Sequence, residues 1–378
     1  MSGRSFPTLL SRRVPDARSI LLISDIEMSV GGVEDDFSHD GLIADLLDVY
    51  TKPPYDSLPV DLVLNGDVYD TLKIPYKGVF TWHITPEIAL YKLNKVIEAH
   101  SELFDALQAF GSHSSGNKRL HFVVGNHDPD IMFPEVQARL RQRLAGVAEM
   151  TFAGFSMRVG PVHIEHGHQL DQVFAMDSEC PFGVWNGESI LKLPWLSAAL
   201  IEALSPIKSI FHTYERLRPR SVVFERWPEL AEIVQALLRK RVQASLRRPL
   251  TVRRDPAETL TWAMAKQIVL RAYTQSPNAG IDAAKVAKLF IDDPSLKLAA
   301  FGHTHKPTWS MVGTRTIIHT GCMRDEYEID REGESIRAIP KSYGEVVLVG
   351  DKIGDVLIPS KDHDDVPRRE QDIVADNK

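Results

Sequence analysis

The chain has 378 residues, of which 43% are hydrophobic and 25% are charged, so it can form one large or two modest domains. A net charge of −7 argues against nucleic-acid binding through overall charge, and two cysteines, Cys180 and Cys322, cannot build a disulfide framework and favour the cytoplasm. We expect neither a signal peptide nor a transmembrane helix, because no run of 18 apolar residues occurs.

Short apolar runs rich in β-branched residues predict a series of strands along the chain. In order these are Ser19–Ser24, Val60–Leu64, Leu120–Val124, Met150–Phe155, Val162–Glu165, Lys297–Phe301, Thr316–His319, Glu345–Val349 and Val356–Ile358. Helical spacing of apolar residues predicts helices between them, at Asp40–Tyr50, from an N-cap at Thr85 to about Phe110, and at Phe133–Leu144. Strands and helices that alternate in this way indicate an α/β fold.

A long segment before Lys297 has mostly helical patterning and interrupts this alternation. Helices are expected at Ile190–Leu204, Phe211–Leu217, Pro228–Leu246, Pro256–Thr274 and Asp282–Ile291. We therefore predict a core made of residues 1–178 and 293–360, a helical cap or insertion at 179–292, and a mobile charged tail at 361–378.

The insertion is basic: Lys208 to Arg254 contains 12 Lys and Arg residues against 4 Glu residues. Such a stretch is most simply a solvated helical face. The alternative is a surface that faces phosphate groups or anionic lipid, which would allow peripheral membrane contact.

Five polar segments follow predicted strands directly, at the end where ligand sites of α/β sheets concentrate. They are Asp25-Ile26-Glu27, Gly66-Asp67-Val68-Tyr69-Asp70, Gly125-Asn126-His127-Asp128, His166-Gly167-His168 and Gly302-His303-Thr304-His305. A mixed set of carboxylate, amide and imidazole donors without cysteine suits Mn²⁺, Fe²⁺, Co²⁺ or Zn²⁺. The sequence therefore predicts a metal site.

These segments, in this order, resemble the motifs of the calcineurin-like metallophosphoesterase superfamily. The resemblance covers residues 19–171 and 297–325 and implies a four-layer αββα sandwich of two mixed β-sheets. It further implies two divalent metal ions bridged by Asp67. One metal would take Asp25, Asp67, His305 and the residue at position 27, and the other would take Asp67, Asn126, His166 and His303. A hydroxide between the metals would attack phosphorus.

The resemblance also implies roles around the metals. His127 would stabilise or protonate the leaving oxygen, and Asp128 would orient His127. Other polar residues are expected to contact the ligands or the substrate: Asp70, His168, Asp171 and His319. The acidic loop Glu34–Asp36 is interpreted as solvated rather than as a third metal site.

Glu27 departs from the family motif, which has histidine at this position. Glu27 could ligate in place of histidine, which would make the site harder and favour Mn²⁺ or Mg²⁺, with Mn²⁺ the first choice. Alternatively it could turn away and leave that metal weakly held, or mark an inactive relative. Since the other motif positions are intact, an inactive relative is the least favoured of the three alternatives.

The predicted function is metal-dependent hydrolysis of a phosphodiester, phosphomonoester or pyrophosphate in a phosphorylated small-molecule or lipid-linked substrate. One alternative is hydrolysis of the pyrophosphate of a lipid-linked nucleotide, because the chain distantly resembles the UDP-2,3-diacylglucosamine pyrophosphohydrolase branch. Another is a binding scaffold that keeps the fold without turnover. A nuclease is disfavoured by the acidic body of the protein, and the oligomeric state is left open.

Overall fold

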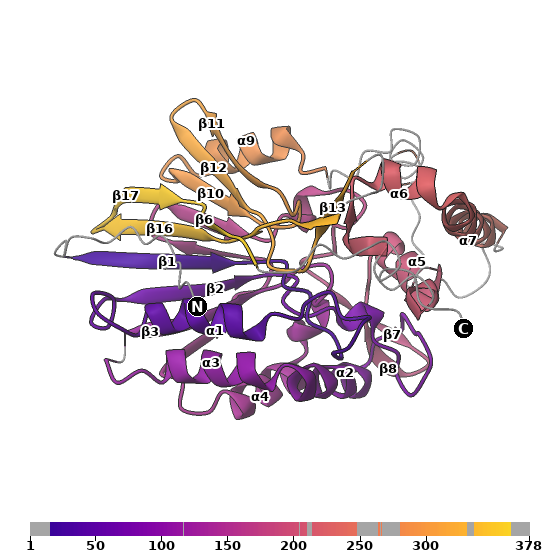
Figure 1. The fold of residues 1–378 in the computed structure, drawn as a ribbon, viewed down its shortest axis with the longest axis horizontal. Coiled ribbons are helices and arrows are strands. Elements are labelled where there is room, and N and C mark those ends of the chain that lie inside the picture. The colour runs from indigo at the N-terminus through magenta and orange to yellow at the C-terminus, as the bar shows by residue number, and fades with distance from the viewer. Residues whose placement is uncertain are drawn as a thin grey trace.

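Two mixed β-sheets form the body of the protein in the computed structural model (Figure 1). The structure describes residues 16–363, apart from 116, 204, 210–213, 248–263, 265, 267–279 and 331–335. The six-stranded sheet has the order β17-β16-β1-β2-β3-β4, and the five-stranded sheet has the order β11-β12-β10-β6-β5.

The six-stranded sheet is parallel through β1 (Ala17–Ile23), β2 (Val60–Asn65), β3 (Lys118–Val123) and β4 (Glu149–Phe152). On its other side β16 (Gly344–Val349) runs antiparallel to β1, and β17 (Lys352–Leu357) runs antiparallel to β16.

The five-stranded sheet is parallel through β6 (Val162–Glu165), β10 (Leu298–Phe301) and β12 (Arg315–Thr320). Two antiparallel edge strands, β5 (Ser156–Val159) and β11 (Pro307–Val312), complete it.

Alternation along β1 explains how the layers stack. Ile20 and Leu22 join the core between the sheets, together with residues such as Ile164 and Ala300 of the second sheet. Leu21 points the other way, toward the helices, because successive side chains of a strand face opposite sides.

The helices α1 (Asp40–Val49), α2 (Pro86–Ala99), α3 (Ser101–Gly111) and α4 (Pro134–Arg143) cover the outer face of the first sheet. The helix α9 (Ala283–Asp292) packs against the outer face of the second sheet. The predicted four-layer sandwich is thus confirmed.

The insertion contains more than the predicted helices. Its helices are α5 (Trp195–Ala203), α6 (Arg220–Arg226) and α7 (Pro228–Arg247), and it also contains a hairpin of β7 (Phe182–Trp185) and β8 (Glu188–Leu191). The predicted start of the first helix, Ile190, is therefore wrong, since β8 occupies that position. The expected helix at 256–274 lies outside the described residues except for positions 264 and 266.

A small three-stranded sheet joins the insertion to the chain that follows β12. In it β9 (Leu217–Arg218) pairs with β13 (Tyr327–Ile329), which pairs with β14 (Ile336–Ala338). The short strands β15 (Lys341–Ser342) and β18 (Ser360–Lys361) form a further pair. The division at residues 178 and 293 stays a prediction, and α9, which falls inside the predicted insertion, packs on the core sheet. No helix in the described part of the chain is long and apolar enough to cross a membrane.

The long helix predicted from Thr85 to Phe110 is two helices that meet at His100. Thr85 caps the first of them as expected, by accepting a hydrogen bond from the Ile88 N–H. The buried ring of His100 lies between two carboxylates, with Nδ1 2.8 Å from Asp40 and Nε2 3.0 Å from Asp35. The break thus coincides with the contact of His100 with Asp35, in the loop before α1, and with Asp40, the first residue of α1.

Because His100 lies between these two carboxylates, we expect the stability of the protein to depend on pH. Burial alone would lower the pKa of His100, but Asp35 and Asp40 raise it from 6.5 to about 9. The folded state therefore binds more protons than the unfolded state between these values, so the stabilisation is complete below pH 6.5 and is lost as the pH rises through 9. We expect urea unfolding to show a loss on the order of 3 kcal/mol across this window, and less in His100→Gln. Parallel pH profiles for the two proteins would contradict this assignment.

Candidate dimetal centre

The five polar segments meet at one edge of the two sheets, as their places after β1, β2, β3, β6 and β10 require. Backbone hydrogen bonds tie the segments together. The Asp25 N–H donates to the Gly66 carbonyl at 3.1 Å, and the Gly302 N–H donates to the His166 carbonyl at 3.0 Å. The second of these bonds links segments that are more than 130 residues apart in the chain. The motifs therefore form one site.

At two motif positions only glycine fits, because a carboxylate of the site lies very close to the backbone. A Cβ atom at Gly125 would lie 2.1 Å from Oδ1 of Asp67, and one at Gly302 would lie 2.6 Å from Oδ2 of Asp25. Any side chain at either position would push a carboxylate out of the site. The glycines thus allow the loops to converge.

Strained backbone concentrates at the same place. Eight non-glycine residues in the described part of the chain have positive φ, and five of them are predicted metal ligands: Asp25, Glu27, Asp67, His303 and His305. This conformation is uncommon for residues other than glycine, and strain of this kind clusters at functional sites.

One group of donors surrounds Asp67. Its Oδ2 lies 3.1 Å from Nε2 of His166, and His303 completes a buried cluster whose ligand atoms lie within 4.8 Å of one another. His166 hydrogen-bonds the Asn65 carbonyl through Nδ1 at 2.9 Å, which leaves Nε2 for a metal. Oδ1 of Asn126 is buried and has no hydrogen-bond partner among the described residues.

A second group of donors surrounds His305. Its Nε2 lies 3.3 Å from Oδ1 of Asp25 and 3.4 Å from Oε1 of Glu27. Its Nδ1 lies 2.9 Å from Glu326, a carboxylate that fixes the ring orientation and leaves Nε2 toward the site. Glu326 was not predicted, since the segment Arg324-Asp325-Glu326 matches none of the five motifs.

Both groups fit divalent metal ions. Donor atoms that share one ion lie roughly 3 Å apart, because each lies about 2 Å from it. The separations of 3.1, 3.3 and 3.4 Å agree with this value. Moreover, Oε1 of Glu27 and Nε2 of His166 are buried without a hydrogen-bond partner in the described structure.

The charges of the cluster also call for cations. Burial alone would lower the pKa of His166, but Asp67 and Asp25 raise it to about 10. In the same way burial is outweighed at His305, whose pKa is raised to about 9 by Asp25 and Glu326. The buried carboxylates of the cluster therefore favour positive charge beside them, which divalent metal ions would supply.

The carboxylate that meets His127 is Asp70, whose Oδ1 lies 3.0 Å from the ring Nδ1. Asp128 instead accepts hydrogen bonds from the backbone N–H groups of Gly125 and Val68, each at 2.7 Å. The prediction that Asp128 orients His127 is therefore wrong. The loop after β3 turns the Asp128 side chain back onto the backbone, where it holds two motif loops together, and Asp70 takes the contact with the imidazole.

The other predicted residues lie around the same cluster. Asp171 contacts Nε2 of His303 at 3.3 Å, and His319 contacts the Thr304 hydroxyl at 3.4 Å. His168 is fully buried with its ring centroid 5.5 Å from that of His166. Burial, together with His166 and His303, holds the pKa of His168 well below its ordinary value.

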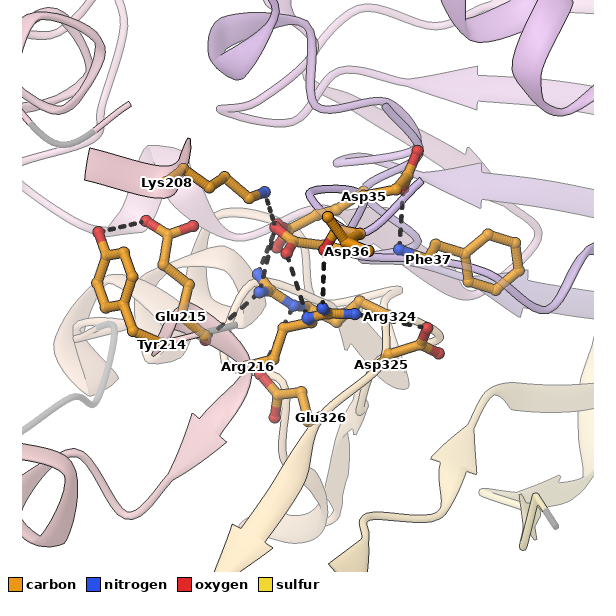
Figure 2. A network of polar contacts seen from close by, with 12 residues as sticks. Asp35, Asp36, Phe37, Lys208, Tyr214, Glu215, Arg216, Arg324, Asp325 and Glu326 are labelled. Carbon is orange, nitrogen blue, oxygen red and sulfur yellow. Dashed lines mark hydrogen bonds and ion pairs between the residues drawn. The ribbon is translucent and has the colours of Figure 1, made fainter. Parts of the chain in front are cut away.

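A buried network of charges adjoins the Glu27 side of the site, because Arg324 contacts both Glu27 and Asp36. Figure 2 shows the part of this network around Asp36. Asp36 lies at its centre, with Lys208 at 2.9 Å, Lys73 at 3.1 Å and Arg324 at 3.3 Å. The expectation that the acidic loop is solvated is wrong for Asp35 and Asp36, which are buried, although Glu34 is exposed. The partners of Asp36 come from distant parts of the chain, and the sequence offers no local signal for them.

The network also changes the interpretation of the basic insertion. Lys208 is buried against Asp36, and Arg241 is buried and paired with Glu202. Arg218 pairs with Glu326 and is largely covered. These three cations are therefore occupied by carboxylates of the protein itself, whereas Arg239 and Lys240 of the same stretch are exposed.

A sequence model of the calcineurin-like phosphoesterase family matches residues 18–307. The chain belongs to this family. It is accordingly a metal-dependent phosphoester hydrolase, and membership implies a dimetal centre, for which the two donor groups are the candidate ligands. No curated protein matches the chain.

Solved structures similar to this calcineurin-like phosphoesterase include three proteins of low sequence identity. A single mutant of Vps29 from Entamoeba histolytica has a TM-score of 0.29 and 10% identity, with 91% of this chain and 99% of that chain covered. Phosphopantetheinyl hydrolase (PptH) from Mycobacterium tuberculosis has a TM-score of 0.27 and 14% identity, with coverage of 82% and 92%. A dimetal phosphatase from Danio rerio has a TM-score of 0.32 and 13% identity, with coverage of 90% and 98%.

Proposed function

We propose that this protein hydrolyses a phosphoester with two divalent metal ions shared across Asp67. One ion is assigned to Asp25, Glu27, Asp67 and His305, and the other to Asp67, Asn126, His166 and His303. The observation that supports this best is the convergence of two donor groups whose ligand atoms lie the right distance apart for shared ions.

The metals, when bound, would supply a nucleophile from water and neutralise charge on the phosphoryl group. The protein's own residues do the rest. His127 is half-buried beside Asp67, to whose Oδ1 its backbone N–H donates at 2.8 Å. From there its ring is suited to give a proton to the leaving oxygen, and Asp70 at Nδ1 orients the ring.

For the native metal we propose Mn²⁺. The donors assigned to the Glu27 side are three carboxylates and one imidazole, which is a harder set than zinc sites prefer. For the substrate we propose a phosphodiester, phosphomonoester or pyrophosphate on a small or lipid-linked molecule. We further propose a cytoplasmic location, in keeping with two free cysteines, one exposed and one buried.

Metal removal tests the proposal directly. We expect the metal-stripped protein to hydrolyse neither p-nitrophenyl phosphate nor bis-(p-nitrophenyl) phosphate, and Mn²⁺ to restore more activity than Mg²⁺, Co²⁺ or Zn²⁺ added singly. The same ions without protein are the control. Failure of every metal on both esters would contradict general phosphoesterase activity and favour a binding scaffold.

A further inference from the structure

The two oxygens of the Glu27 carboxylate face different partners. Oε2 lies 2.5 Å from a guanidinium nitrogen of Arg324 and 3.4 Å from the Lys73 ammonium. Oε1 faces Nε2 of His305 at 3.4 Å and has no hydrogen-bond partner in the described structure. One oxygen is thus held by cations, and the other points into the candidate dimetal centre.

Arg324 is built into the site. Its backbone N–H donates to the Asp25 carbonyl at 2.9 Å, so a candidate ligand fixes the position of its main chain. Its side chain is 4% exposed and reaches Asp36 at 3.3 Å beyond Glu27. A side chain held at both ends in this way can set the angle of Glu27.

Of the two cations beside Glu27, Arg324 is the one whose main ion-pair partner is Glu27. Lys73 lies nearer to three other carboxylates, at 2.6 Å from Asp70, 2.7 Å from Glu215 and 3.1 Å from Asp36. Arg324 makes its shortest ion pair with Glu27. Asp36, its other close partner, already has Lys208 and Lys73.

The charge of this pair matters because the family motif has a neutral histidine where this chain has Glu27. An added carboxylate makes the ligand set more negative by one unit, and one guanidinium restores the balance. A neutral histidine and a glutamate–arginine pair therefore give the site the same net charge. A guanidinium serves this purpose well, since it stays charged when buried.

We propose that Glu27 and Arg324 together replace the family's histidine: Glu27 ligates one metal through Oε1, and Arg324 positions Glu27 and offsets its charge. This inference rests on the proposed dimetal function. The competing arrangement is a single-metal site in which Arg324 and Lys73 take the place of the second ion. The two arrangements differ in the number of metals bound.

Metal counting on variants of the full chain separates them. We expect the wild type to bind two Mn²⁺ ions by calorimetry and to give the electron paramagnetic resonance spectrum of a coupled pair. Arg324→Met should weaken one of the two ions by roughly 10- to 100-fold, the usual effect of losing a group that supports a ligand. Glu27→His alone should also weaken it, because Arg324 then faces the metal as an unbalanced cation. The double variant Glu27→His/Arg324→Met should recover two ions.

Arg216→Met is the matched control. Arg216 is equally buried and lies 3.8 Å from Asp36 in the same network, and it also contacts Val33, Asp325 and the ring of Tyr327. It should keep both ions. If Arg324→Met does not fold, Arg324→Lys, which keeps the charge without the planar fork, should still lower the affinity for one ion only.

The outcomes are distinct. One Mn²⁺ per active wild-type chain would overturn the glutamate–arginine proposal while metal-dependent hydrolysis stands. No bound metal and no activity would overturn the proposed function itself. Equal losses in Arg324→Met and Arg216→Met, or no recovery in the double variant, would reduce Arg324 to a general structural role.

Discussion

Asp67→Asn should leave the protein folded but unable to hold metal ions at either position. Asp67 is assigned to both metal ions: its Oδ2 faces His166 at 3.1 Å, and the residue also clusters with Glu27 and His127. An amide keeps the shape of the side chain but carries no charge to share between two cations. We expect hydrolysis to fall by roughly 1,000-fold or more, the scale on which a central catalytic group acts.

Asp61→Asn is the control for this prediction. Asp61 is another fully buried carboxylate of the same strand region, and it pairs with Arg18, Arg119 and His121 away from the candidate centre. This variant should lose stability but keep two metal ions, as counted by calorimetry. Full metal occupancy in Asp67→Asn would remove its bridging role, whatever happened to turnover.

Residues that follow apolar strands could be predicted from the sequence because the signal is local. Asp25 and His303 stand directly beyond β1 and β10, and parallel strands bring their ends to one edge. The edge strand β11 was missed, since all six of its residues are exposed and no alternation marks it. Likewise the break at His100 depends on Asp35 and Asp40, about 60 residues earlier.

Contacts between distant segments explain what the sequence could not show about the site. Arg324 lies 297 residues from Glu27, and Lys208 lies 172 residues from Asp36. The family resemblance implied that Asp128 orients His127, yet His127 meets Asp70, and Asp128 accepts hydrogen bonds from backbone amides. Neighbours in a tight loop point in different directions, so partners of this kind follow only from the fold.

His127→Ala should keep both metals and lose the proton donor to the leaving oxygen. Its ring is held by Asp70 at 3.0 Å and is half-buried beside Asp67. We expect turnover of phenyl phosphate to fall by roughly 100-fold or more, the usual contribution of a positioned acid. The loss should be smaller on p-nitrophenyl phosphate, whose leaving group needs little protonation. Equal losses on the two esters would contradict the role of an acid.

Asp70→Asn and Asp128→Asn separate the two carboxylates near His127. If Asp70 orients the ring, Asp70→Asn should reproduce the leaving-group dependence, and adding it to His127→Ala should cost little more, because the two residues act as a unit. Asp128→Asn should instead weaken the loops that it joins through Gly125 and Val68. Metal affinity and stability would then fall, and turnover of both esters would fall by the same factor. A leaving-group effect in Asp128→Asn alone would return the orienting role to Asp128.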